Sequence, residues 1–179
     1  MIDLFLAEGF EEVEAIAPVD ILRRAGLRVQ TVGIGGPRVK GSHGVEVTAD
    51  LGEKDFSLDG LDMVVLPGGG LGTKNLEKSP LVRAALLYCA QNGRRIAAIC
   101  AAPSILGHLG LLEGRTAACY PGYEGELGAA AVSKEPVCVS GPFITARGAG
   151  VAVDFALRIV EVLLGPEQSR QVRKKIQCP

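Results

Sequence analysis

Residues 94–106 read RRIAAICAAPSIL and predict the central element of the fold. The run 96–99 is apolar without alternation, which is typical of a parallel strand buried on both faces. Pro103 suits the first turn of a helix, and apolar residues follow it at helical spacing. Cys100 is therefore predicted at a sharp turn between a buried strand and a helix.

Two interpretations of Cys100 are open at this stage. At such a turn its sulfur would meet the amides and positive dipole end of the following helix, which stabilise a thiolate and a developing oxyanion. This is a nucleophile elbow with cysteine in place of serine. Alternatively, a cysteine at a strand end packs as a small hydrophobic residue.

The composition favours one domain spanning residues 1–179. A chain of this length buries roughly 70% of the surface that its unfolded form exposes. The net charge is −1 and no long basic block occurs, which argues against a nucleic-acid footprint. No apolar stretch reaches the length of a membrane span, and the chain begins directly in a strand pattern. We therefore expect a cytoplasmic protein that contacts no membrane.

The cysteines predict free thiols. There are five of them, with no CxxC pair and no secretion signal. A disulfide framework and a zinc site are both disfavoured by this pattern. We expect neither a metal nor a cofactor.

The order of elements predicts a doubly wound α/β domain, a parallel sheet with helices on both faces. Strands are expected at 2–7, 27–34, 63–66 and 96–99, with helices from Glu11 to Arg24, at 81–90, after Cys100 and at 151–164 and 167–175. A hairpin arm is expected at 38–48, bending at 42–44. Further short elements are expected as a strand at 115–119, a small helix at 123–131, and a hairpin or two edge strands at 137–139 and 143–145.

Three features fall together at one edge of this sheet, outside the carboxyl ends of the strands where ligands bind. They are the glutamate-rich loop after the first strand, the turn Pro67-Gly68-Gly69-Gly70, and Cys100. The glycines either form a flexible turn or let backbone amides approach a ligand. Their convergence with Cys100 predicts a site.

Glu11, Glu12 and Glu14 suit the positive start of a helix, which is explanation enough for two of the three. Glu11 and Glu14 share a face, so either could turn toward Cys100. A carboxyl group there would be desolvated, with a raised pKa, and could hydrogen-bond a thiolate or move a proton. Of the two histidines, His108 is expected to be structural, and His43 could reach the cleft only if the arm folds back.

Several separated motifs carry a resemblance to a known family. They are LPGG at 66–69, AAICAAP at 97–103, EEVE at 11–14 ahead of PVD at 18–20, RRAG at 23–26 and TARG at 145–148. Together they resemble the ThiJ/PfpI superfamily, in the branch of the Parkinson-disease protein DJ-one and its bacterial relatives. The resemblance runs nearly end to end.

The resemblance implies a flavodoxin-like sandwich and a homodimer, with an oxidation-sensitive cysteine at Cys100. It places the family's hydrogen-bonding glutamate at Glu14 and the amides of Gly69 and Ala101 at the oxyanion positions. It further implies a cleft that includes Gly68, Gly70, Tyr120, His43 and Arg24. Family activities include a glutathione-independent glyoxalase, a debated deglycase acting on methylglyoxal adducts, oxidative-stress sensing and chaperone-like behaviour.

The chain departs from the family pattern near the cysteine. Tyr120 stands where the branch commonly has a histidine before proline, and tyrosine is a poor base because its unperturbed pKa is about 10. His43 replaces an arginine at the mouth of the cleft. Cys119 is either a resolving thiol for Cys100 or an ordinary buried residue.

We therefore predict a cofactor-free cysteine protein that converts methylglyoxal or related 2-oxoaldehydes, or their glycated adducts, through Cys100 and Glu14. The alternative is a redox sensor or chaperone in which Cys100 is oxidised without carbonyl turnover. Peptidase activity is disfavoured, because Ala101 stands where a histidine would follow the cysteine. An apolar face around Ile16, Val19 and Leu22 is expected to serve a homodimer interface or the core.

Overall fold

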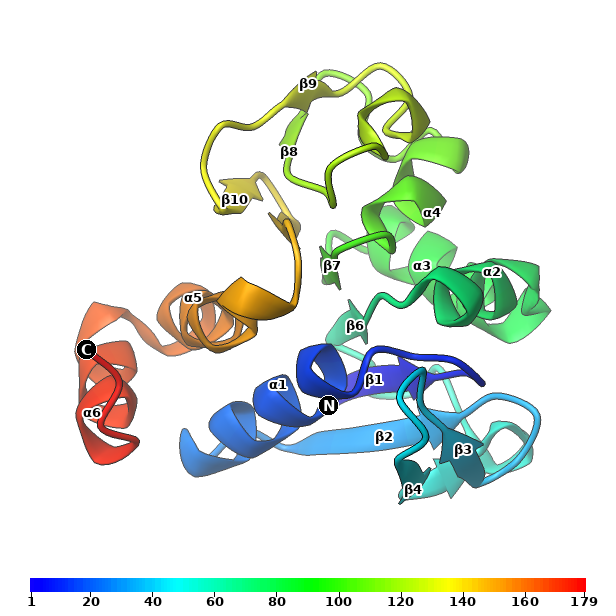
Figure 1. The fold of residues 1–179 in the computed structure, drawn as a ribbon, viewed down its shortest axis with the longest axis horizontal. Helices are drawn as coiled ribbons and strands as arrows, with labels where there is room; N and C mark the ends of the chain where they lie inside the picture. Colours follow the sequence, from blue (N-terminus) through cyan, green and yellow to red (C-terminus); the bar gives the residue numbers. More distant parts are fainter.

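The computed structural model describes all residues, 1–179, and its centre is a seven-stranded sheet in the order β10-β11-β7-β6-β1-β2-β5 (Figure 1). Only the pair β10–β11 is antiparallel. The strands of this sheet are β1 (Ile2–Leu6), β2 (Val29–Gly33), β5 (Leu51–Gly52), β6 (Met63–Leu66), β7 (Arg95–Ile99), β10 (Val137–Ser140) and β11 (Phe143–Ala146).

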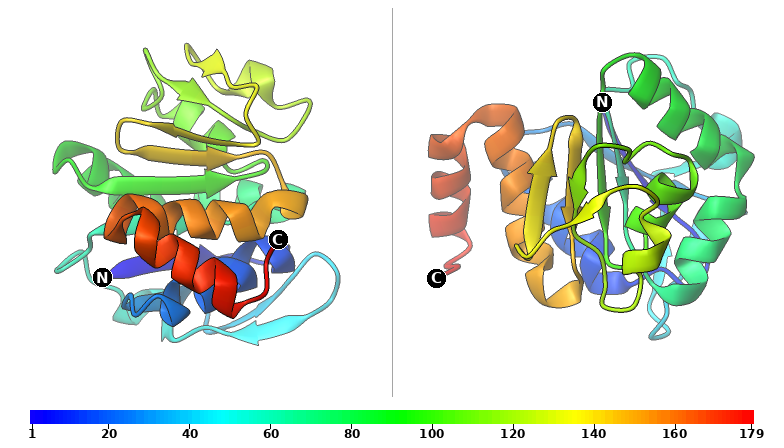
Figure 2. Two further views of the ribbon diagram at one scale, coloured as in Figure 1. Left: turned by 90° about the vertical axis from the view of Figure 1, so that its left-hand side faces the viewer. Right: turned by 90° about the horizontal axis from the view of Figure 1, so that it is seen from above.

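Helices cover both faces of the sheet, which confirms the predicted doubly wound, flavodoxin-like α/β class. They are α1 (Glu12–Arg24), α2 (Gly70–Lys78), α3 (Pro80–Gln91), α4 (Pro103–His108), α5 (Ala152–Leu164) and α6 (Pro166–Lys175), with 3-10 turns η1 (Glu53–Asp55), η2 (Glu124–Glu126) and η3 (Ala149–Val151). Figure 2 shows α5 and α6 on one side of the strands and α2 and α3 on the other.

Each face of the sheet has its own apolar core. Successive strand residues point to opposite faces, so Leu4 and Leu6 of β1 pack with Phe155 of α5, whereas Phe5 packs with Leu86 of α3. Both clusters are closed to solvent, and a central strand apolar throughout is what two covered faces require. Among these helices none combines the length and apolar character needed to cross a membrane.

Several short elements differ from the sequence expectation. Helix α2 was not expected, because its sequence is rich in glycine and poor in apolar residues; it packs so closely on the first loop that a Cβ at Gly72 would lie 2.7 Å from Phe10 Cα. The small helix expected at 123–131 is only the turn η2, in a stretch interrupted by glycines. Of the two alternatives expected at 137–145, the hairpin is confirmed: β10 and β11 pair antiparallel, and because β11 also pairs in parallel with β7, β10 alone lies at this edge of the sheet.

Two short pairs of strands lie outside the main sheet. The predicted hairpin arm is present as β3 (Arg38–Lys40) and β4 (Glu46–Thr48), which pair antiparallel, and β8 (Thr116–Ala117) pairs with β9 (Ala131–Val132). The arm folds back onto the loop before α1, where Ser42 N donates to Phe10 O at 2.8 Å. This contact carries His43 to the start of α1.

Candidate active site

Cys100 lies directly after β7, at the carboxyl end of the central strands. Its φ of 66° is in the left-handed region that side chains rarely adopt, so the turn is strained. Two backbone hydrogen bonds of 2.8 Å hold it: Cys100 N donates to Ala146 O, and Cys100 O accepts from Tyr120 N. The neighbouring strand and the loop after β8 together keep the cysteine in this conformation.

The backbone amides of Gly69 and Ala101 lie near the sulfur of Cys100 and favour its charged form, so they lower the pKa of the thiol. Burial and the charge of Glu14 nevertheless raise the pKa of the thiol to about 12, while the two amides act in the opposite direction. The direction of this shift is opposite to the thiolate stabilisation expected from the start of the following helix. Helix α4 begins only at Pro103 and is six residues long, so the helix dipole is too small and too distant to dominate.

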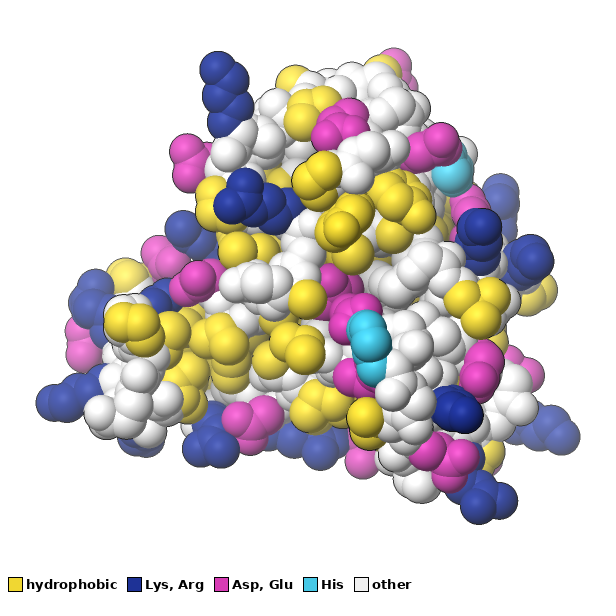
Figure 3. Space-filling model, viewed as in Figure 1, with side chains coloured by type: hydrophobic (Ala, Val, Ile, Leu, Met, Phe, Trp, Pro, Cys, Tyr) yellow, Lys and Arg dark blue, Asp and Glu magenta, His cyan; other side chains and the backbone are white.

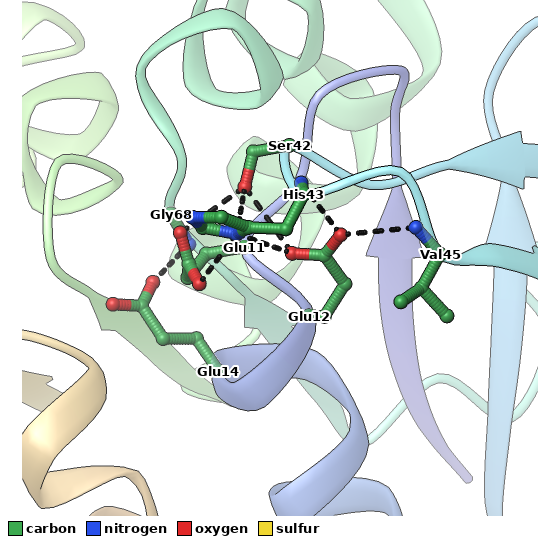
Figure 4. Close-up of polar contacts among 7 residues, drawn as sticks. All are labelled: Glu11, Glu12, Glu14, Ser42, His43, Val45 and Gly68. Atoms are coloured by element: carbon green, nitrogen blue, oxygen red, sulfur yellow. Dashed lines mark hydrogen bonds and ion pairs between the residues drawn. The ribbon is translucent and has the colours of Figure 1, made fainter.

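Glu14 is the carboxylic acid of the site (Figure 4). It is fully buried in the first turn of α1, where Oε2 accepts from Gly68 N at 2.9 Å and Oε1 has no hydrogen-bond partner. Burial raises the pKa of Glu14 to about 7, although contacts with the Cys100 side chain and the Gly68 amide lower it. A carboxyl group with this pKa can both accept and return a proton near neutrality.

Gly68 lies between Cys100 and Glu14. A Cβ at Gly68 would lie 2.6 Å from Cys100 Cβ and 2.6 Å from Glu14 Oε2, so no larger residue fits. Gly69 has a φ of 91°, and a Cβ there would lie 2.3 Å from Gly9 O, so this position also requires glycine. Gly70 is different: it is the exposed first residue of α2, and nothing lies near its Cβ position, so a side chain would fit there.

His43 meets the glutamates at the start of α1. Its Nδ1 lies 2.9 Å from Glu12 Oε2 and 3.4 Å from Glu11 Oε1, and its side chain is 71% exposed. Burial would raise the pKa of Glu12, but hydrogen bonds from the His43 ring and from backbone amides lower it to about 2. Glu12 thus anchors the arm, a role beyond that of a helix-start charge. Figure 3 shows acidic and histidine side chains together over this region.

Tyr120 and Cys119 lie beside the elbow with different surroundings. The ring of Tyr120 is half exposed, and its Cδ2 is 3.3 Å from the Cβ position of Gly148. Cys119 belongs to the core cluster under α2, α3 and α4, whereas Cys100 packs against the other cluster. Burial raises the pKa of Cys119 to about 11. These positions favour the packing interpretation of Cys119 over a resolving thiol.

Two residues predicted from motifs lie away from Cys100. Arg24 ends α1, ten residues after Glu14 and so about 15 Å along the helix. It pairs with Asp20 at 2.6 Å, which corrects its assignment to the cleft. His108 bridges Glu77 and Glu126 on the outside of α4, in agreement with the structural role expected for it.

Thr145 was missed by the sequence reasoning. It is buried in β11, and its Oγ1 accepts from Ala118 N at 2.8 Å. This bond aligns the segment that leads to Tyr120 with the elbow. A polar residue within an otherwise apolar strand was the available signal, because a buried hydroxyl must find a partner.

The fold and site define an α/β protein with a cysteine on a strained elbow, paired with a buried glutamate. The model of the DJ-1/PfpI family matches residues 2–162. The Drosophila melanogaster protein dj-1beta is 40% identical over 174 residues, covering 96% of this chain and 93% of that protein. The Caenorhabditis elegans protein named glutathione-independent glyoxalase DJR-1.2 is 33% identical over 171 residues, covering 94% and 91%.

Solved structures agree with these relatives. The oxidized form of Toxoplasma gondii DJ-1 superposes with a TM-score of 0.95 at 33% identity, covering 98% of this chain and 97% of that chain. The family match spans most of the chain, and the fold is the same. The chain therefore belongs to the DJ-1/PfpI family.

Proposed function

We propose that this protein converts 2-oxoaldehydes such as methylglyoxal into 2-hydroxy acids such as lactate, without glutathione. The observation that carries the proposal is the pairing of Glu14 with Cys100. A buried carboxyl group with a pKa of about 7 and an unpaired oxygen atom lies against a cysteine whose sulfur has two backbone amides near it. The glyoxalase name of the Caenorhabditis elegans relative supports the same chemistry.

The first step of the proposed reaction forms a hemithioacetal. Glu14 accepts the proton of the Cys100 thiol, and the sulfur adds to the aldehyde carbon. The amides of Gly69 and Ala101 hold the oxygen that becomes negative, because preorganised donors stabilise developing charge. Glu14 then returns the proton to this oxygen. Activation by the neighbouring carboxylate explains how a thiol with a raised pKa reacts.

The second step moves hydrogen between the two carbons of the substrate. Glu14 removes the proton from the former aldehyde carbon, giving an enediolate, and delivers it to the adjacent carbon, while the hydroxyl proton of the hemithioacetal passes to the oxygen of that adjacent carbon. The product is a thioester of the 2-hydroxy acid on Cys100. Water then hydrolyses the thioester, releasing lactate and the free thiol, so that the net reaction adds one water to methylglyoxal.

The experiment is lactate formation from methylglyoxal in the absence of glutathione. Wild type is compared with Cys100→Ala and Glu14→Gln, and Cys138→Ser is the matched control because Cys138 is a half-buried cysteine on β10. We expect turnover in the wild type and the control and loss in the other two. Equal turnover by Cys100→Ala would contradict the proposal.

A second candidate is redox sensing through Cys100. The same two amides and a protonated Glu14 could donate hydrogen bonds to a sulfinate on Cys100, so the site would stabilise this oxidation product. Mass spectrometry after mild peroxide tests it. Selective gain of two oxygen atoms at Cys100, with no aldehyde turnover by the unoxidised protein, favours the sensor.

We also propose a homodimer in the cytoplasm. Of the apolar residues expected at an interface, Val19 and Leu22 lie in the core, while Ile16 remains exposed together with Val13 of the same helix. These two side chains, 41% and 52% exposed, are the physical support for an interface on α1. Sedimentation as a monomer at micromolar concentration would overturn the dimer, and cell fractionation tests the location.

A further inference from the structure

A second cluster of functional groups lies where the hairpin arm meets α1, and the proposed reaction does not use it. Glu11, Glu12 and His43 each offer one ligand atom, and these atoms all lie within 4.8 Å of one another. His43 Nδ1 is 2.9 Å from Glu12 Oε2 and 3.4 Å from Glu11 Oε1. Two ligands of one zinc ion lie roughly 3.0–3.4 Å apart when each bond is about 2.1 Å long.

Glu12 is already oriented for this role. Its Oε1 accepts from His43 N at 2.7 Å and Val45 N at 3.4 Å, which leaves Oε2 facing the imidazole (Figure 4). Gly41 allows this approach, because a Cβ there would lie 2.4 Å from the Glu12 carboxyl carbon. Such outer hydrogen bonds hold ligands in place and are typical of metal sites.

Ser42 orients both carboxylates. Its hydroxyl lies 3.1 Å from Glu11 Oε2 and 3.2 Å from Glu12 Oε2, so it can satisfy an oxygen of either side chain. The imidazole is 71% exposed, which leaves room for water as a further ligand. The ligands therefore come from a rigid helix start and a docked hairpin bend, with one side open to solvent.

The charge of the cluster also favours a cation. The side chains of Glu11 and Glu12 are only 19% and 11% exposed, and neither pairs with a lysine or arginine. Their single basic partner is His43. Even a protonated imidazole balances only one of the two negative charges that lie against it. A divalent ion would balance them.

We propose that Glu11, Glu12 and His43 form a binding site for a divalent transition-metal ion, with Zn²⁺ the best match to one imidazole and two carboxylates. Carboxylate and imidazole ligands both suit this ion, and water would complete its shell. The site is separate from Cys100, which contributes no ligand. The cysteine pattern argues only against a zinc site with thiolate ligands, and the proposed site uses no cysteine.

The other histidine provides a matched comparison. His108 also contacts two glutamates, but Glu77 lies at Nδ1 and Glu126 at Nε2. The two ring nitrogens point in different directions, so these carboxylates cannot share one ion with the imidazole. His108 thus has the same residue types without the converging geometry.

The first test uses the two imidazole signals of the full chain in the Cys100→Ser background, recorded by NMR during addition of Co²⁺. We expect the ring protons of His43 to shift or broaden by one equivalent, with His108 unaffected. An unaffected His43 at one equivalent would overturn the proposal. Because the readout is spectroscopic, its failure is independent of any failure of the proposed aldehyde chemistry.

The second test measures Zn²⁺ affinity by competition with a chromophoric chelator. His43→Arg keeps a cation beside Glu12 but cannot ligate, and His43 is exposed, so this variant is expected to fold. We expect His43→Arg and Glu11→Gln to weaken binding by at least about tenfold, while His108→Gln and Cys100→Ser bind as the wild type does. Equal affinity in His43→Arg, or loss in Cys100→Ser, would overturn the site.

Discussion

Glu12 and Glu14 stand two residues apart in the first turn of α1, and both are buried, yet their pKa values shift in opposite directions. The pKa of Glu12 is lowered to about 2 and that of Glu14 is raised to about 7. Glu12 meets the hydroxyl of Ser42, two backbone amides and the His43 ring, whereas Glu14 meets one amide and leaves Oε1 unpaired. Glu14 is the more deeply buried of the two and has fewer donors, and both differences make its charged form the less stable one.

Helix geometry explains why two neighbours differ so much. Residues two apart are separated by about 200° around the axis, so they face opposite ways. Glu12 faces the hairpin arm, which is rich in backbone donors, and Glu14 faces the end of the sheet and Cys100. One side chain consequently anchors structure, and the other is suited to carry a proton.

The largest expected effect comes from changing Glu14 to Gln. Loss of the proton carrier should lower lactate formation by about 10²–10⁴-fold, the usual contribution of general acid–base catalysis. Glu12→Gln keeps Glu14 and Cys100 in contact, so its loss should be smaller. Steady-state kinetics on the two variants checks this, and a larger loss in Glu12→Gln would contradict the division of roles.

Gly68→Ala should disturb the site by overpacking it. The new methyl group would collide with Cys100 and Glu14, and such overpacking costs about 1–3 kcal/mol of unfolding free energy. Gly70→Ala is the matched control, since nothing lies near that Cβ position in α2 and alanine favours a helix. Urea unfolding of both variants is the measurement. Similar free energies of unfolding for the two variants would contradict the prediction and show that the backbone near Gly68 shifts to accommodate the methyl group.

The pH dependence of stability should separate the two glutamates. Glu14 binds its proton more tightly in the folded state, so its contribution to stability falls as pH rises from 4.5 to about 7. The lowered pKa of Glu12 makes its contribution complete above 4.5 and lost as pH falls toward 2. The measurement is the unfolding midpoint as a function of pH. Glu14→Gln should reduce the pH dependence only between pH 4.5 and about 7, and Glu12→Gln should reduce it only between about pH 2 and 4.5.

The smallest effect is expected for Tyr120→Phe. The ring lies beside the elbow, but Glu14 contacts the thiol, so removal of the hydroxyl should lower turnover by less than about tenfold. The same kinetic assay measures it. A loss as large as that of Glu14→Gln would move the proton-transfer role to Tyr120 and weaken the comparison on which the proposed mechanism rests.

Much of the fold could be predicted because its signals are local. The strand at 63–66 matches the structure residue for residue, and the predicted hairpin arm is present. Helix α2 was missed because it is held by tertiary packing of Gly72 on Phe10 rather than by helix propensity. Arg24 was misplaced because a sequence motif does not say where its residues lie in space. Along α1, Arg24 is ten residues from Glu14 and therefore far from the site.

Unbroken apolar runs and glycine turns were enough to indicate the sheet, the turn at Cys100 and the presence of a nearby glutamate. The residue pattern left Glu11 and Glu14 open, and the family resemblance pointed to Glu14. The tertiary structure shows Glu14 beside the thiol, and it alone decided the direction of the Cys100 pKa shift and the docking of His43 on α1. These properties depend on burial and on donors from segments such as 41–45 and 68–69, which are distant in sequence from the groups they act on. Periodicity describes which face of an element is apolar, but only packing brings a donor to a charge.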